Sequence, residues 1–279
     1  MDVQEPIGLL AGWGRFPFVV AEKARSLGIP VVCVALRGMA SPELKPLVTK
    51  FHWTRLGGMG RTIRLFRKGG VSRFMMAGKV HKVQILHPWR WLYVLPDIRV
   101  LRFWFNRMRS DNRDDSLLLS IIDEFRKDGL RCESALELCP ELLVRQGVLT
   151  KRQPTAREEA DLVFGWELAK EMGRLDIGQS VVIREKTVIA VEAIEGTDQA
   201  ILRGGELCRK NGFVVVKVAK PQQDMRFDVP TVGTQTIEML HRAGGKVLAI
   251  EAGKTIILDE AETISLADRY GISIVAKAA

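Results

Sequence analysis

Short apolar runs alternate with segments of helical periodicity along the first half of the chain. Apolar runs of strand length occupy residues 7–11, 30–36 and 72–77. Apolar residues at helical spacing fill the stretches 17–28, 61–67 and 114–128. Because strands that alternate with helices are typical of βαβ units, the pattern predicts a parallel sheet with crossover helices.

The second half resumes this alternation after a polar break at residues 149–154 (LTKRQP), which predicts a linker. Strands are predicted at 181–184, 187–191, 214–218, 246–250, 255–258 and 272–275, and helices at 160–173, 199–210, 234–243 and 260–269. The predicted fold class is therefore α/β. A Rossmann-like N-terminal domain with a parallel sheet covers 1–150, a second α/β domain covers 151–279, and the ligand crevice is expected between them.

Composition restricts the class of protein. The 279 residues are 47% hydrophobic and 27% charged, which is typical of a globular chain and excludes a disordered, collagen-like or coiled-coil protein. The cysteines form no C-x-x-C pair and the histidines show no metal-ligand spacing, which argues against a redox couple or a zinc site. Residues 1–6 lack the layout of a signal peptide, and no apolar run approaches the roughly 20 residues that cross a bilayer. We expect a cytoplasmic protein, peripheral on the cytoplasmic face of the inner membrane if it touches lipid.

The basic charge is concentrated in one stretch. Residues 79–109 carry +6 of the net charge of +9, and they hold three of the six tryptophans, Trp89, Trp91 and Trp104. Aromatic rings beside cations suit the headgroup boundary of a membrane. They also suit single-stranded nucleic acid, whose bases stack on such rings. A helix that buries its rings and exposes its charges to solvent explains the stretch equally well. The residues alone therefore do not decide between a lipid surface, nucleic acid and an ordinary helix.

A glycine turn follows the first predicted strand. Gly12 and Gly14 stand between a strand and a helix, where backbone N–H groups can receive an anion. The dinucleotide motif requires a third glycine where Pro17 stands, and the acidic residue expected after the second strand is absent, so NAD is improbable. A turn that only lets strand and helix pack closely is the plainer explanation.

Two acidic segments follow predicted strands of the second half. Residues 191–198 (VEAIEGTD) leave one strand and open a helix, and residues 217–230 leave another strand and contain two prolines. Carboxylate oxygens with few soft ligands nearby favour Mg²⁺, or Mn²⁺ in its place, over zinc. Such an ion, together with basic side chains, suits phosphoryl transfer. A helix cap at Asp198 and a surface pair of Arg226 with Asp228 are the structural alternatives.

Ordered motifs along the whole chain resemble those of one family. They are residues 12–17 (GWGRFP), 77–80 (AGKV), 114–118 (DDSLL), 173–179 (GRLDIGQ, the most distinctive), 191–198 (VEAIEGTD), 220–230 (KPQQDMRFDVP) and Gly233. In these motifs the chain resembles the LpxI family of UDP-2,3-diacylglucosamine pyrophosphatases. The resemblance implies hydrolysis of UDP-2,3-diacylglucosamine to UMP and 2,3-diacylglucosamine 1-phosphate (lipid X) in lipid A biosynthesis, dependence on Mg²⁺, and two domains that hold the lipid between them. The abundance of aromatic and basic residues in 79–109 departs from the family.

The resemblance also assigns roles to residues. The required aspartate of the family's R-x-D-x-P motif falls on Asp228, with Asp198 and Glu195 as further catalytic candidates. Metal ligands are expected at Asp228, Asp224 and Asp198. In the family, the residue at the position of Asp224 is either Asp or Glu. Substrate-binding residues are expected at Gly12, Gly14, Gly78, Lys79, Gly196, Thr197, Lys220, Gln223, Arg226, Thr231 and Gly233.

Two other functions remain as alternatives. A non-catalytic protein that binds nucleic acid through residues 79–109 would show steep salt dependence, although no nucleic acid is expected as a partner under the resemblance. The second alternative function is hydrolysis of the pyrophosphate of a soluble nucleotide sugar.

Overall fold

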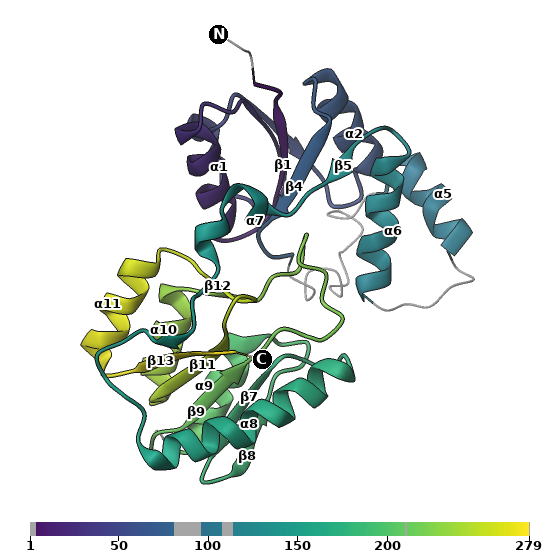
Figure 1. The fold of residues 1–279 in the computed structure, drawn as a ribbon. Coiled ribbons are helices and arrows are strands. Elements are labelled where there is room, and N and C mark those ends of the chain that lie inside the picture. The colour runs from purple at the N-terminus through teal and green to yellow at the C-terminus, as the bar shows by residue number, and fades with distance from the viewer. Residues whose placement is uncertain (1–3, 81–95, 108–113, 210, 279) are drawn as a thin grey trace. The chain divides into compact units, whose positions relative to one another are not determined.

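The chain forms two compact units, Met1–Pro140 and Glu141–Ala279 (Figure 1). The computed structural model describes residues 4–80, 96–107, 114–209 and 211–278. Each unit is built on its own sheet with helices, which confirms the predicted α/β class with a parallel N-terminal sheet and a second α/β domain. The crevice expected between the domains stays a prediction.

The boundary between the units lies ten residues before the predicted one at residue 150. The predicted linker is bound to the second unit: Leu149 N–H donates to the Ile274 carbonyl at 2.9 Å, and Thr150 Oγ1 accepts from Ile274 N–H at 3.0 Å. The predicted linker is therefore part of the second unit, where its backbone and side chains make hydrogen bonds. The boundary between the two units lies at Pro140.

Within the described residues, the first unit holds a parallel sheet of five strands in the order β3-β2-β1-β4-β5. The strands are β1 (Ile7–Ala11), β2 (Val31–Leu36), β3 (Lys50–Thr54), β4 (Arg73–Ala77) and β5 (Arg131–Cys132). The order reverses between β1 and β4, and the carboxyl ends at such a point are where α/β sheets bind ligands. The edge strand β3 was not predicted, because its polar Lys50 and His52 break the apolar run on which the prediction relied.

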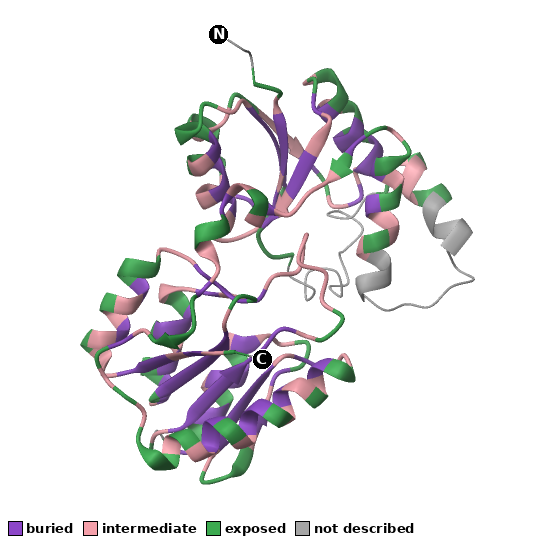
Figure 2. Ribbon diagram, viewed as in Figure 1, coloured by how far each residue is buried: buried purple, intermediate pink, exposed green. Residues whose placement is uncertain are grey.

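Helices cover both faces of this sheet. One face packs against α1 (Phe16–Ser26), the 3₁₀ turn η1 (Pro42–Leu47) and α7 (Ala135–Leu138). The other packs against α2 (Met59–Lys68) and α6 (Asp114–Arg126), with Phe66, Phe74 and Phe125 in mutual ring contact. Two further elements are α5 (Ile98–Arg107), which contacts α2, and the 3₁₀ turn η2 (Pro140–Leu142). Figure 2 shows buried residues concentrated in the strands and on the helix faces toward them.

In the described part of the second unit, a sheet of six strands has the order β6-β13-β11-β9-β7-β8. Its strands are β6 (Gly147–Val148), β7 (Ser180–Arg184), β8 (Thr187–Val191), β9 (Val214–Lys217), β11 (Val247–Glu251) and β13 (Ser273–Lys277). Strands β9, β11 and β13 are parallel, whereas β7 is antiparallel to both β9 and β8. A separate parallel pair joins β10 (Thr231–Val232) to β12 (Ile256–Ile257).

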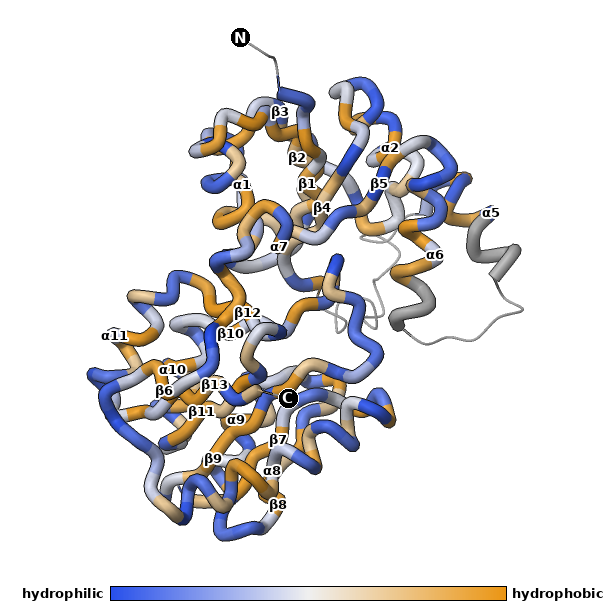
Figure 3. Tube along the Cα trace, in the orientation of Figure 1, coloured by the Kyte–Doolittle hydropathy of each residue, from blue (hydrophilic) through white to orange (hydrophobic). Residues whose placement is uncertain are grey.

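The second sheet is also covered on both faces. Helix α8 (Ala156–Arg174) packs on one face through Leu162 and Trp166. The other face packs against α9 (Thr197–Leu207), α10 (Thr234–Ala243) and α11 (Glu260–Tyr270). Figure 3 shows the central strands as the hydrophobic part of this unit and the outward helix faces as hydrophilic. Two apolar layers therefore fix the sheet that carries the predicted acidic segments.

Strand β11 ends in a fully buried carboxylate, Glu251, with an exposed fraction of 0%. Its Oε2 accepts from Lys170 Nζ at 2.6 Å and from Ala219 N–H at 2.8 Å, and Lys254 Nζ lies 3.0 Å from its Oε1. Burial by itself would raise the pKa of Glu251, but the hydrogen bonds from the two lysines and the amide outweigh it and hold the pKa below its ordinary value. The charged form therefore stabilises the folded state.

We expect Glu251→Gln to lower the free energy of unfolding at pH 7 by about 1–3 kcal/mol, because the lysines lose a charged acceptor. Because the folded pKa is the lower one, the contribution is complete above the unfolded value of about 4.3 and disappears as the pH falls through the folded pKa. Urea titrations of both proteins between pH 7 and pH 3 measure this.

The control for this titration is Glu171→Gln, which removes a 64% exposed partner of Arg174 and should change the free energy by less than about 1 kcal/mol. A difference between wild type and Glu251→Gln that stays constant across the pH range would contradict the account.

Candidate functional site

The predicted acidic segments of the second unit meet at one edge of its sheet. Because β8 and β9 are both antiparallel to β7, they run in the same direction and end at the same edge. Residues 192–197 follow β8, and residues 218–230 follow β9. The structure therefore brings the two segments to the same edge of the sheet, after two strands that flank β7, and α/β sheets bind ligands at the carboxyl ends of their strands.

Thr197 is the centre of a buried polar cluster at this edge. Its Oγ1 accepts from Lys217 Nζ at 3.1 Å, donates to Glu192 Oε1 at 3.0 Å and lies 3.2 Å from Ser180 Oγ. A hydroxyl has one donor and two acceptor positions, so these contacts fill it. The hydroxyl of Thr197 therefore fixes the start of α9, and its hydrogen-bonding positions are used within the protein. Gly196 before it has a φ of 85°, the left-handed region that favours glycine, and allows the sharp turn from strand to helix.

Lys217 connects this turn to the strand β10. Its side chain is 4% exposed, and its Nζ also donates to the Thr231 carbonyl at 3.0 Å. The Thr231 hydroxyl itself donates to the Val229 carbonyl at 2.9 Å. Glu192 is 8% exposed, and its Oε2 has no hydrogen-bond partner among the described residues. One ammonium group thus joins two segments that the sequence predicted as parts of the site.

Ser180 and Lys217 were not among the predicted site residues. The signal for Lys217 was present, because a charged residue ends the otherwise apolar strand Val214–Lys217. A lysine inside a central strand is costly to bury without partners, so its position alone indicated a polar cluster. Ser180 carried no such signal, since serine at the start of a strand is common.

The distinctive motif at 173–179 holds the loop at 218–230. Asp176 Oδ1 accepts from Lys220 Nζ at 2.5 Å, and the Gly173 carbonyl accepts from Gln222 Nε2 at 3.0 Å. Within the loop, Lys220 N–H donates to Gln223 Oε1 at 2.9 Å. The motif therefore serves to shape the loop, and the contact of Lys220 with Asp176 neutralises part of the positive charge predicted for a phosphate.

Asp224 and Asp228 lie in this loop in different surroundings. Asp224 accepts from the Arg226 guanidinium at 2.6 Å and 3.0 Å, and hydrogen bonds from Arg226 hold the pKa of Asp224 below its ordinary value. Asp228 is half-buried; its N–H donates to the Asp224 carbonyl at 3.0 Å, and among the described residues no group donates to its carboxylate. Asp228 is thus the loop carboxylate whose oxygens remain open to a ligand.

The other predicted carboxylates have partners of their own. Glu195 accepts from Arg203 Nη2 at 2.6 Å and from Ala193 N–H at 3.2 Å, so it stabilises the turn. Asp198 accepts from Gln235 Nε2 at 3.1 Å, which connects α9 to α10. Gly233 stands directly before α10 in extended backbone.

The expected metal ligands do not form a preassembled set. In the part of the chain that the structure describes, no group of three or more histidine, cysteine, aspartate or glutamate side chains is placed to hold an ion. Asp224 already accepts hydrogen bonds from Arg226, and Asp198 accepts one from Gln235. The residues present therefore do not fit a Mg²⁺ site built by protein side chains alone, and dependence on Mg²⁺ stays a prediction.

In the first unit, the glycine turn after β1 packs against the turn after β4. Gly12 N–H donates to the Ala77 carbonyl at 2.8 Å, and Trp13 and Lys79 exchange backbone hydrogen bonds of 2.9 Å and 2.8 Å. A Cβ on Gly12 would lie 2.8 Å from the Lys79 carbonyl oxygen, so glycine is needed for this approach. The amides of Gly12 and Trp13 are thus used within the protein. Substrate contacts by other atoms of Gly12, Gly14, Gly78 and Lys79 stay predictions.

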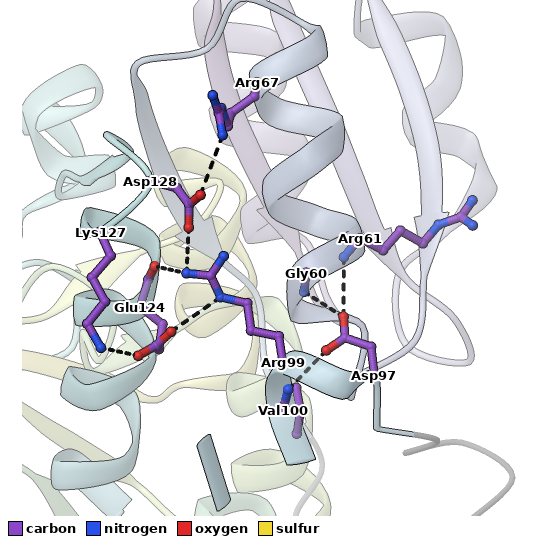
Figure 4. A network of polar contacts seen from close by, with 9 residues as sticks. All are labelled: Gly60, Arg61, Arg67, Asp97, Arg99, Val100, Glu124, Lys127 and Asp128. Atoms are coloured by element: carbon purple, nitrogen blue, oxygen red, sulfur yellow. Dashed lines mark hydrogen bonds and ion pairs between the residues drawn. The ribbon is translucent and has the colours of Figure 1, made fainter. Parts of the chain in front are cut away.

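Within the basic and aromatic stretch, charged side chains hold the start of α5. Asp97 accepts from Gly60 N–H at 2.6 Å and from Val100 N–H at 3.0 Å, so one carboxylate caps both α2 and α5 (Figure 4). Arg99 pairs with Glu124 at 3.2 Å and with Asp128 at 2.5 Å. At the surface of α5, Ile98 is 85% and Leu101 44% exposed.

The roles predicted for much of this stretch lie outside the described residues, which omit 81–95 and 108–113 and with them Trp89 and Trp91. No helix among the residues that the structure describes is long and apolar enough to cross a membrane.

Comparison with known proteins covers both units. The LpxI N-terminal domain matches residues 6–142, and the LpxI C-terminal domain matches residues 145–275. The chain is also similar to the UDP-2,3-diacylglucosamine pyrophosphatase LpxI of Caulobacter vibrioides, with 32% identity over 278 residues that cover 96% of each chain. On both matches, the chain belongs to the LpxI family.

Proposed function

We propose that the chain hydrolyses the pyrophosphate of UDP-2,3-diacylglucosamine to UMP and 2,3-diacylglucosamine 1-phosphate, in lipid A biosynthesis. The observation that carries the proposal is the match to a relative named for this activity over 96% of both chains. Both domains of the family are present in this chain and in the same order. This supports assigning the complete activity of the relative to the chain, and not the role of a single domain.

The contacts at the edge of the second sheet support Asp228 as the catalytic residue. In the reaction, a water oxygen bonds to one phosphorus, the bridging P–O bond breaks, and the water loses a proton to a base. Asp228 is suited to hold and deprotonate that water, because its carboxylate accepts no hydrogen bond from the described residues. Asp224 is less suited, since both of its oxygens accept from Arg226.

Backbone and basic groups near this edge suit the substrate phosphates. The first-turn amides of α9, after Gly196, carry the positive end of the helix dipole, which stabilises anions. Arg226 has a 42% exposed side chain and remains within reach of solvent while it pairs with Asp224. These groups bind and orient the pyrophosphate in the proposal, and they stabilise the charge that develops on it.

We expect Asp228→Asn to reduce the kcat for UMP release by at least about 100-fold, because a positioned base typically contributes that much or more. The substitution conserves shape and removes the proton acceptor, so the melting temperature should change little. The matched control is Asp123→Asn, at a 56% exposed carboxylate of α6, which should retain full activity. Turnover at the wild-type rate in Asp228→Asn would remove Asp228 from the mechanism.

Mg²⁺ dependence is the second expectation for activity. Magnesium is commonly held by one or two carboxylates together with substrate phosphates, which is compatible with a chain that has no preassembled set of ligands. We expect UMP release to stop with excess EDTA and to return with Mg²⁺, and more weakly or equally with Mn²⁺. Full activity in EDTA after exhaustive chelation would show a metal-independent reaction.

We also propose peripheral contact of α5 with the membrane, because the substrate carries two acyl chains. Ile98 and Leu101 are exposed, and Arg102 beside them is exposed as well, a combination that suits an anionic lipid surface. We expect co-sedimentation with phosphatidylglycerol vesicles, reduced several-fold in Ile98→Asp/Leu101→Asp. Equal binding of the double variant, or competition by an oligonucleotide, would contradict lipid contact through α5.

A further inference from the structure

Two neighbouring strands of the second sheet end in buried charges. Lys217 ends β9 and is 4% exposed, and Glu251 ends β11 and is 0% exposed. In the strand register Lys217 lies opposite Ile250, so Glu251 is one residue farther along. The preceding residues of both strands are apolar and buried. Because a buried charge costs free energy unless it is well paired, two of them at one edge require an explanation beyond packing.

Glu251 holds the beginning of the loop at 218–230. Its Oε2 accepts from Ala219 N–H at 2.8 Å, and Lys170, its ion-pair partner, donates to the Ala219 carbonyl at 3.4 Å. The pair therefore binds both polar groups of one residue, which is 1% exposed. The next residue is Lys220, so this contact fixes the point at which the chain leaves the core.

Lys217 holds the end of the same loop. Its Nζ donates to the Thr231 carbonyl at 3.0 Å, directly after Val229 and Pro230. The pairing of β10 with β12 and the hydrogen bond from Ile256 N–H to the Pro230 carbonyl, at 2.9 Å, add backbone support there. The same ammonium donates to Thr197. Lys217 thus sets the loop end and the start of α9 relative to each other.

We propose that Lys217 and Glu251 are positioning residues of the hydrolytic site, which hold the two ends of the loop so that Asp228 is kept in one place. The proposal rests on the proposed function, in which Asp228 acts on the attacking water. Neither side chain needs to touch the substrate. Their effect is on geometry, and displacement of a catalytic group by about 1 Å can cost on the order of 100-fold in rate.

The test compares Lys217→Met and Glu251→Gln with Arg152→Met. Arg152 is the matched control because it pairs with Glu158 and Ser273 at the opposite edge of the same sheet, where β13 begins. We expect the first two variants to lose about 10-fold or more in kcat with KM changed less than about 3-fold. Arg152→Met should lose stability but keep the kcat of the folded protein. The conservative variant Lys217→Arg should retain more of the kcat than Lys217→Met.

Combination with Asp228→Asn separates positioning from general destabilisation. If Lys217 and Glu251 act through Asp228, their substitution in an Asp228→Asn background lowers the residual rate little further. A structural defect that reduces the fraction of folded enzyme would instead lower the rate by the same factor in both backgrounds, and that result would overturn the proposal.

Loop anchoring is also measurable without turnover, which separates this proposal from the proposed function. Hydrogen exchange of the full chain should accelerate over residues 219–232 in Lys217→Met and Glu251→Gln but not in Arg152→Met, and trypsin should cut faster after Arg226. Unchanged exchange in this loop would overturn the proposal. If exchange accelerates in the two variants but the wild-type protein releases no UMP, the anchoring roles of Lys217 and Glu251 are supported and the proposed function is refuted.

Discussion

The buried ammonium of Lys217 is the interaction on which the candidate site depends. It lies at the end of a central strand and donates to the Thr197 hydroxyl and to the Thr231 carbonyl, which belong to segments far apart in the sequence. Without a buried donor between them, the turn at Gly196 and the strand β10 would have no common contact at this point. Glu192, joined through Thr197, balances the charge. A polar cluster of this kind stabilises a fold only when its members are paired, so it also restricts which conformations the edge can adopt.

Much of the architecture could be predicted from the sequence, since it follows from apolar periodicity. Strands such as Val31–Leu36 and Val247–Glu251 are buried on both faces and are visible as apolar runs. The edge strand β3 was not predicted, because only one of its five residues is buried. The linker at 149–154 was misplaced for a related reason: its polar residues bind the second unit through single contacts that composition does not reveal.

The candidate site was only partly predictable, because motifs name segments but not partners. The segments around Gly196 and Asp228 were identified from their motifs, and they do lie at the carboxyl edge of the second sheet. Which carboxylate is free could not be read from the sequence: Asp224 and Asp228 have the same chemistry, and only the position of Arg226 distinguishes them. Likewise, the turn at Gly12 and Gly14 is compatible in sequence with an anion site, whereas the structure uses Gly12, together with Gly78, for a close approach of two backbones.

The central claim is that substrate phosphates bind at the carboxyl edge of the second sheet, beside Asp228. The most direct measurement is the change in backbone amide chemical shifts when UMP or the intact substrate is added to an Asp228→Asn variant, whose turnover is strongly reduced. The account predicts the largest changes in residues 196–199 and 219–231, with little change at the opposite edge around Arg152. Changes confined to other parts of the chain, with both of these segments unaffected, would contradict it.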